Sequence, residues 1–228
     1  MSNEKEDVKA RVLKNGVIVA GHPRSGTSLV CQLLESAGVE FPSDFEGDEY
    51  NRAGYYELEK SKKLSRNLLK EAMTIENTKD MNQIVERLNS CDGPGGLKLV
   101  RIGALFFYRH IARNLRCVFV YRHPSEVKAS LFRRGISRFK PDWVENNNAL
   151  IAGYENIEKS IIISYDSLVS GDEWVKDAFL DLGFKVNLGL INSKERSQKN
   201  SRVMATDEEE KLYNILCELE EEVKQEVK

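Results

Sequence analysis

Short apolar runs along the chain alternate with segments in which apolar residues recur every three or four positions. Four runs predict β-strands, at residues 16–20 (GVIVA), 97–100, 116–121 (RCVFVY) and 160–164 (SIIIS). The first is β-branched throughout its centre and carries no polar alternation, which is typical of a strand covered on both faces in a parallel sheet.

Helical spacing follows most of these runs. The first helical pattern runs from Leu29 to Ala37 and stops at Gly38, a residue suited to a helix C-cap. Two more patterns lie between residues 58 and 90, before the chain-breaking sequence CDGPGG. Further helices are predicted at 105–111, after Pro124, over 174–182, and from a capping box at Thr206 and Glu209 onward.

Strands that alternate with helices of this length predict βαβ units. They indicate an α/β protein with a central, mainly parallel sheet between helical layers. The 228 residues, 41% of them apolar, suffice for one substantial core, so we expect a single domain over residues 1–228 with a helical insertion at about 42–92. Because ligands of such sheets bind beyond the carboxyl ends of the strands, a site is expected in the loops there.

Charge and composition argue against nucleic acid, a membrane and metal as partners. With 34 basic and 36 acidic residues the net charge is −2, so no overall field favours nucleic acid or an anionic membrane. The apolar runs fall far short of the roughly 20 residues that span a bilayer, and the N-terminal MSNEKEDVKAR lacks the apolar core of a secretory signal. The four cysteines are widely spaced and form no C-x-x-C pair. We therefore expect a cytoplasmic protein with reduced thiols, no membrane span and no bound metal.

The segment after the first predicted strand has the features of a phosphate-binding loop. Residues 21–28 read GHPRSGTS and lie between a buried strand and an amphipathic helix. Backbone N–H groups in such a loop point at an anion, which the helix dipole also favours. The spacing copies G-x-x-x-x-G-K-[ST], but Thr27 replaces the lysine and the cation of the loop is Arg24. A tight turn without a ligand is the alternative interpretation.

A nucleotide or small-molecule kinase needs the missing lysine beside the phosphates and an acidic residue that holds Mg²⁺. Asp166, after the fourth predicted strand, is the candidate for that acid, and it fits a loop or cap position equally well. The kinase interpretation is therefore disfavoured and kept as an alternative.

Residues 17–39, VIVAGHPRSGTSLVCQLLESAGV, resemble the phosphosulfate loop of sulfotransferases that use 3'-phosphoadenosine 5'-phosphosulfate (PAPS), a family with a P-loop-like three-layer α/β fold. In a second family element, a strand followed by R-x7-S contacts the 3'-phosphate of the cofactor, and VFVYRHPSEVKAS supplies Arg122 and Ser130 at that spacing. The resemblance spans roughly residues 14–190. It implies an enzyme that moves a sulfuryl group from PAPS to an acceptor hydroxyl or amine and releases 3',5'-ADP.

The resemblance also implies which residues bind the cofactor. The loop residues for the phosphosulfate are Pro23, Arg24, Ser25, Gly26, Thr27 and Ser28. Arg122 would bind the 3'-phosphate through two parallel hydrogen bonds, and the hydroxyl of Ser130, two turns into the next helix, would bind the same phosphate. Tyr165 in SIIISYDSLV is similar to a tyrosine that lies by the adenine in the family, and a core or strand-end tyrosine is the alternative.

Sulfuryl transfer should rely on positioning and charge stabilisation, as phosphoryl transfer does. Arg24 is the first catalytic candidate, because the reaction needs a cation near the bridging oxygen and Arg24 points from the loop at the 5'-phosphosulfate. Arginine replaces the more frequent lysine in some branches of the family, notably the tyrosylprotein sulfotransferases. Lys98, on the predicted strand GLKLV, resembles the lysine that follows the corresponding strand in that branch and in several bacterial members, although Leu99-Val100 replaces the D-P that usually follows. A solvent-exposed lysine at a strand edge is the alternative for Lys98.

Two further catalytic candidates come from shorter matches. Glu57 in NRAGYYELEK resembles the N-x-x-G-Y-x-E segment of bacterial relatives and is the candidate general base, whereas the alternative is an acid at a charged helix start. Ser193 in NSKERSQ resembles a serine that lies by the leaving group in the tyrosylprotein sulfotransferases. His22 is another possible base.

The acceptor is not identified by the sequence, because acceptor pockets come from variable helices and loops. A protein that binds PAPS through Arg24, Arg122 and Ser130 without catalysing transfer is the remaining alternative.

Overall fold

A computed structural model describes residues 9–48, 54–70, 73–191 and 203–227. In this part of the chain, β1 (Gly16–Ala20), β2 (Gly95–Leu99), β3 (Leu115–Tyr121) and β4 (Ser160–Ser164) form one sheet in the order β2-β1-β3-β4. Every pairing is parallel. The predicted α/β class with a parallel sheet is confirmed, and the four apolar runs are its strands because both faces of the sheet are covered.

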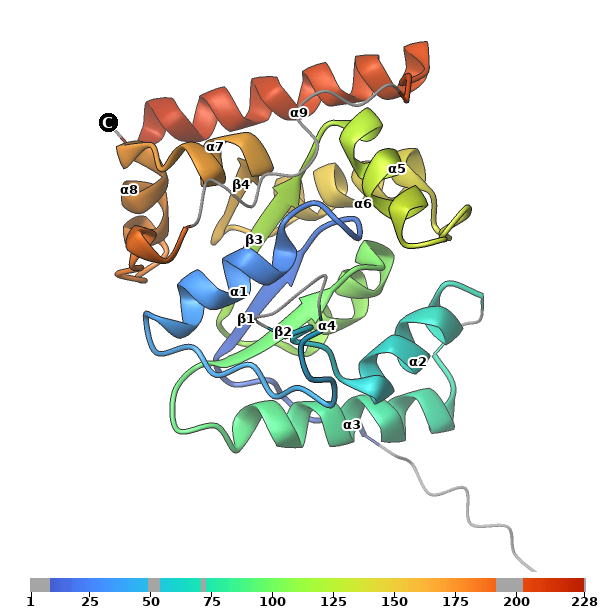
Figure 1. The fold of residues 1–228 in the computed structure, drawn as a ribbon. Helices are drawn as coiled ribbons and strands as arrows, with labels where there is room; N and C mark the ends of the chain where they lie inside the picture. Colours follow the sequence, from blue (N-terminus) through green and yellow to red (C-terminus); the bar gives the residue numbers. More distant parts are fainter. Residues whose placement is uncertain (1–8, 49–53, 71–72, 192–202, 228) are drawn as a thin grey trace, which may run out of the picture.

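Helices form a layer on each face of the sheet (Figure 1). α1 (Thr27–Glu35) packs on β1, β2 and β3 from one side. On the other side lie the turn η1 (Ile102–Ala104), α4 (Leu105–Ile111) and α6 (Trp143–Asn156), and α6 contacts β3 and β4. α5 (Pro124–Arg133) follows the carboxyl end of β3 and α7 (Tyr165–Ser170) follows that of β4. Next in the chain come α8 (Glu173–Asp181), which contacts β4 and α9, and η2 (Leu188–Leu190), which contacts α1.

Both edges of the sheet are covered as well. α9 (Asp207–Glu226) contacts β4, and its Glu220 accepts hydrogen bonds from the Tyr121 hydroxyl (2.7 Å) and the Ser164 amide (2.8 Å). The predicted capping box of Thr206 and Glu209 starts this helix. At the opposite edge, α3 (Ile75–Asn89) contacts β2, and α2 (Glu59–Leu68) packs on α3. Covered edges protect the outer strands from pairing with another chain.

The hydrophobic pattern does not predict α6, because its buried face is partly polar. Asn146 and Asn147 are both fully buried in that helix. Asn146 accepts from the Ile102 amide (3.1 Å) and donates to the Val100 carbonyl (2.8 Å). Polar side chains at these positions hide the helical period of apolar residues. The same hydrogen bonds fix the chain where it leaves β2.

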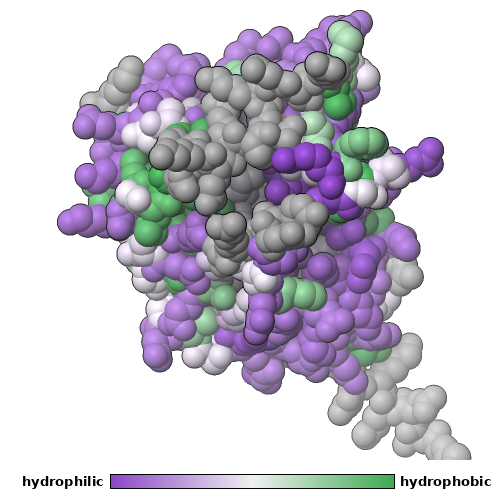
Figure 2. Space-filling model, in the orientation of Figure 1, coloured by the Kyte–Doolittle hydropathy of each residue, from purple (hydrophilic) through white to green (hydrophobic). Residues whose placement is uncertain are grey.

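The face of the molecule shown in Figure 2 is mainly hydrophilic, with small apolar areas. Met204 and Phe132 are the most exposed large apolar side chains. No helix in the described ranges is long and apolar enough to cross a bilayer. Most buried apolar side chains of the described residues form one core around the sheet.

Candidate active site

The loop at residues 21–28 leaves the carboxyl end of β1 and runs into the first turn of α1. Arg24 (φ 74°) and Gly26 (φ 100°) both take left-handed backbone conformations. A side chain at Gly26 would also collide with a neighbour, since a Cβ there would lie 2.6 Å from Cδ2 of Tyr165. Consecutive N–H groups in such a turn, at the start of a helix, form a concave binding site for an anion.

Arg24, Arg122 and Ser130 lie together on one side of this loop, and we call them the arginine site. Arg122 leaves the end of β3, is only 6% exposed, and donates to Glu126 (Nε to Oε2, 2.7 Å) and to the Arg24 carbonyl (Nη1 to O, 3.3 Å). Arg24 donates from Nε to the Ser130 hydroxyl (3.0 Å). The guanidinium of Arg122 also lies 4.1 Å above the ring of Tyr165. Residues from three predicted motifs are thus in contact.

Positive charge is concentrated at the arginine site. Burial lowers the pKa of Arg24, and the neighbouring cations Arg134, Arg122 and Arg133 lower it further. The guanidinium remains charged, since its ordinary pKa is far above neutrality. An anion bound here would offset the repulsion between these groups.

Two polar atoms beside the loop are buried and have no hydrogen-bond partner among the residues that the structure describes. They are the hydroxyl oxygen of Ser25 and Nη2 of Arg122. Leaving a buried donor unpaired costs about 1–3 kcal/mol, and more for a charged group. Both atoms would be satisfied by the oxygens of a phosphate or sulfate group, so the residues present fit an anionic ligand.

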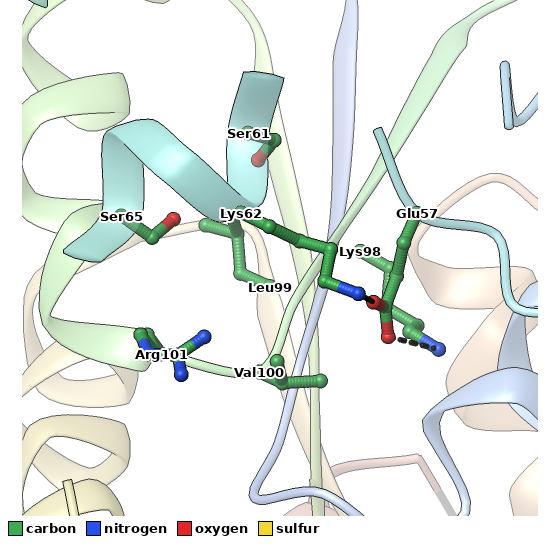
Figure 3. A pocket seen from close by; sticks show the side chains of 8 residues that line it. All are labelled: Glu57, Ser61, Lys62, Ser65, Lys98, Leu99, Val100 and Arg101. Atoms are coloured by element: carbon green, nitrogen blue, oxygen red, sulfur yellow. Dashed lines mark ion pairs between the residues drawn. The ribbon is translucent and has the colours of Figure 1, made fainter. Parts of the chain in front are cut away.

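A second group, the lysine–glutamate site, consists of Lys98, Glu57 and Lys62. Lys98 lies on β2 and donates from Nζ to the hydroxyl of Ser28 in the loop (3.2 Å). Its Nζ also pairs with Oε1 of Glu57 (3.1 Å), and Lys62 pairs with Oε2 (3.2 Å), as Figure 3 shows. Lys98 is only 6% exposed, so the alternative of a solvent-exposed lysine at the strand edge is wrong.

The electrostatics of the lysine–glutamate site favour an ionised Glu57. Burial by itself raises the pKa of this carboxyl, but the charges of Lys98 and Lys62 outweigh burial and hold the pKa below its ordinary value. Glu57 is therefore a carboxylate at neutral pH. It can accept a proton, although its two cationic partners make it a weaker base than an isolated glutamate.

A small hollow that opens to solvent adjoins this pair (Figure 3), and its enclosed part is about the size of one water molecule. We call it the β2 hollow; in the described part of the chain it is lined by Glu57, Ser61, Lys62, Ser65, Lys98, Leu99, Val100 and Arg101. The lysine–glutamate site therefore lies at a hollow that opens to solvent directly beside the loop.

The remaining predicted site residues differ in their positions. Tyr165 is the first residue of α7 and packs on the loop and on Arg122, so it lies at the site and not in the core. His22 is buried, donates from Nδ1 to the Pro23 carbonyl (3.0 Å), and has its pKa lowered to about 4 by burial. Ser193 lies outside the described residues.

Sequence reasoning missed several residues that support the site. Trp143 on α6 donates from Nε1 to the Arg122 carbonyl (3.2 Å), and Glu126 pairs with the Arg122 side chain. The four-residue spacing of Arg122 and Glu126 across the start of a helix is a signal that could have identified that ion pair. No comparable local signal exists for Trp143 or Arg101.

No protein-family model matches this chain, and no curated protein matches it significantly. The solved structures that are similar to this chain include two sulfotransferase domains. The "Sulfotransferase Domain from the Curacin Biosynthetic Pathway" superposes with a TM-score of 0.59 at 11% identity, over 91% of this chain and 99% of that one. The "Sulfotransferase Domain from the Synechococcus PCC 7002 Olefin Synthase" gives 0.55 at 15% identity, over 95% of this chain and 98% of that one. The chain therefore has the fold of these sulfotransferase domains.

Proposed function

We propose that this protein is a sulfotransferase that uses PAPS as donor, transfers its sulfuryl group to a hydroxyl or amine, and releases 3',5'-ADP. One observation carries the proposal: the loop at residues 21–28, whose sequence resembles a phosphosulfate loop, contacts the arginine site through Arg24 and the lysine–glutamate site through Ser28. The fold shared with two sulfotransferase domains supports it.

The charges of the donor match the two ends of this arrangement. PAPS carries a 3'-phosphate and a 5'-phosphosulfate on one nucleoside. Arg122 and Ser130 would bind the 3'-phosphate, for which the unpaired Nη2 of Arg122 is available. The loop residues Pro23 to Ser28 would hold the phosphosulfate, for which the Ser25 hydroxyl is available. The ring of Tyr165 offers a flat surface beside Arg122 for the adenine.

Bound PAPS supplies a sulfuryl group whose bond to the phosphate oxygen breaks as a new bond to the acceptor oxygen or nitrogen forms. Fixed positive charge near that phosphate oxygen favours the reaction, since the leaving nucleotide gains negative charge. In this chain that charge comes from Arg24, from Lys98 through its contact with Ser28, and from the loop N–H groups. Glu57, held by Lys98 and Lys62, would take the proton of the acceptor.

The donor is tested by thermal unfolding in the presence of nucleotides. A ligand that binds only the folded protein stabilises it, by about 2.7 kcal/mol at 100 times its Kd. We expect 3',5'-ADP to raise the Tm and ATP with Mg²⁺ to raise it much less. Equal stabilisation by ATP and Mg²⁺ would favour a kinase and overturn the proposal.

Catalysis is tested by a screen of hydroxyl and amine acceptors with sulfur-labelled PAPS. Transfer of label to an acceptor, lost in Glu57→Gln, is the expected result. Tight binding of 3',5'-ADP without transfer to any acceptor would instead indicate a protein that only binds PAPS.

A further inference from the structure

The β2 hollow has a polar and mainly cationic lining. Three cations, Lys62, Lys98 and Arg101, face one carboxylate, Glu57. The hydroxyl-bearing residues Ser61 and Ser65 are one turn apart on α2 and contribute to the same wall. Among the described residues, the apolar part of the lining is limited to Leu99 and Val100, and none of the lining residues is aromatic. An acceptor that is mostly aromatic or aliphatic would find little apolar surface here.

Arg101 is the cation in this lining that is best placed to bind an anion. Its Nε donates to the Lys140 carbonyl (3.2 Å), and its guanidinium lies 4.8 Å above the ring of Phe139. Among the described residues, no hydrogen-bond or ion-pair partner is found for its two terminal nitrogens, and the side chain is half-buried. These two nitrogens match the spacing of carboxylate or phosphate oxygens.

The electrostatics at Arg101 point in the same direction. Burial lowers the pKa of this guanidinium, the charge of Arg66 lowers it further, and Glu57 opposes the effect. Lys62 and Lys98 already share the single carboxylate of Glu57. The hollow therefore has an excess of positive charge, which a bound anion would offset.

Two sets of side-chain contacts connect the lining of the hollow to the loop at residues 21–28. Lys98 contacts both Glu57 and Ser28, and Phe139, on which Arg101 stacks, packs edge-on against the ring of His22 (5.3 Å between centroids). A compound held at Arg101 would therefore have its other end near Glu57 and the loop.

We propose that the acceptor is a small hydroxyl- or amine-bearing compound that carries a carboxylate or a phosphate. Arg101, with help from Lys62, binds the anionic group, and the reacting hydroxyl or amine lies at Glu57. Arg101 is thus a specificity-determining residue. This inference rests on the proposed sulfotransferase function.

The test uses three compounds that share a diol and differ in one group: glycerate, glyceramide and 3-aminopropane-1,2-diol, which are anionic, neutral and cationic. Their binding to the full-length protein is measured by calorimetry with the nucleotide site saturated by 3',5'-ADP. We expect glycerate to bind about 10-fold or more tightly than the other two, since a charge-assisted hydrogen bond is worth at least that factor. Arg101→Gln should abolish the preference.

The matched control is Arg109→Gln, because Arg109 is exposed on α4 and donates only to the exposed Asn156 among the described residues (3.4 Å). This variant should keep the preference for glycerate. Lys62→Gln gives a second measurement if Arg101→Gln unfolds, and it should weaken the preference because it removes a cation from the same lining.

Equal binding of the three compounds, a preference for the amine, no binding by any of them, or the same loss in Arg109→Gln as in Arg101→Gln would overturn the inference. The proposed function fails in a different way, through absence of 3',5'-ADP binding in the same calorimeter. If 3',5'-ADP does not bind, the affinities of the three compounds are measured on the protein without nucleotide, so the preference for an anion is still tested.

Discussion

Arg122 gives the sharpest test of how the donor is bound. It is only 6% exposed and is fixed by Glu126, by the Arg24 carbonyl and by the ring of Tyr165. Replacing Arg122 alone would break its buried ion pair with Glu126, and removing one partner of such a pair costs about 3–5 kcal/mol of folding stability. The double variant Arg122→Gln with Glu126→Gln removes both charges, and Glu126→Gln alone is its matched reference.

The size of the effect follows from Nη2 of Arg122, which is buried and has no hydrogen-bond partner in the described part of the chain. It is therefore available for a charge-assisted hydrogen bond to the 3'-phosphate. Such a bond contributes about 1.5–3 kcal/mol, which corresponds to about 10- to 150-fold in Kd. Relative to Glu126→Gln, the double variant should lose this factor for 3',5'-ADP. Binding of 5'-AMP should change little, because that nucleotide has no 3'-phosphate.

Calorimetry with both nucleotides on both variants measures this difference directly. Far-UV circular dichroism and Tm values establish that the two variants are folded to the same extent. If the double variant loses equal affinity for 3',5'-ADP and for 5'-AMP, Arg122 does not bind the 3'-phosphate.

Three further predictions concern the loop and the lysine–glutamate site. Arg24→Ala should cost about 2–4 kcal/mol of transition-state stabilisation in single-turnover assays, as loss of one preorganised donor does, with a smaller loss of cofactor affinity because the loop N–H groups remain. A variant that kept its rate and lost only affinity would make Arg24 a binding residue. Glu57→Gln should lower the transfer rate by about 10²–10⁴-fold, and the acid limb of the wild-type pH–rate profile should lie below the ordinary glutamate pKa of 4.5, since Lys98 and Lys62 hold the Glu57 pKa down against burial. An acid limb above that value would exclude Glu57 as the base. Burial lowers the pKa of His22 from 6.5 to about 4, so the folded protein binds this proton less readily than the unfolded chain; the wild type should lose up to about 3 kcal/mol of stability as pH falls from 6.5 to 4. Denaturant titrations should show a smaller loss over that window in His22→Gln, and equal losses would refute the assignment.

Much of the fold could be predicted because its signals are local. The limits of β1 and β4 agree with the predicted strands, since strands covered on both faces appear as uninterrupted apolar runs. The loop could also be predicted, because the strand, the glycines and the helix that build an anion-binding turn are consecutive in the chain. The ion pair of Arg122 and Glu126 is also local, because the two residues are four positions apart across the start of α5.

By itself, then, the sequence determined the class of fold, the four strands and the residues of the loop, because each depends on neighbours in the chain. Which side chains meet across the site was decided by the tertiary structure. Arg24 reaches Ser130 across 106 positions, and Lys98 reaches Ser28 across 70. These contacts exist because the sheet order β2-β1-β3-β4 brings the carboxyl ends of separate strands to one edge. The position of Arg101 over Phe139 and the buried asparagines of α6 likewise follow from packing between distant segments, for which the local pattern carries no signal.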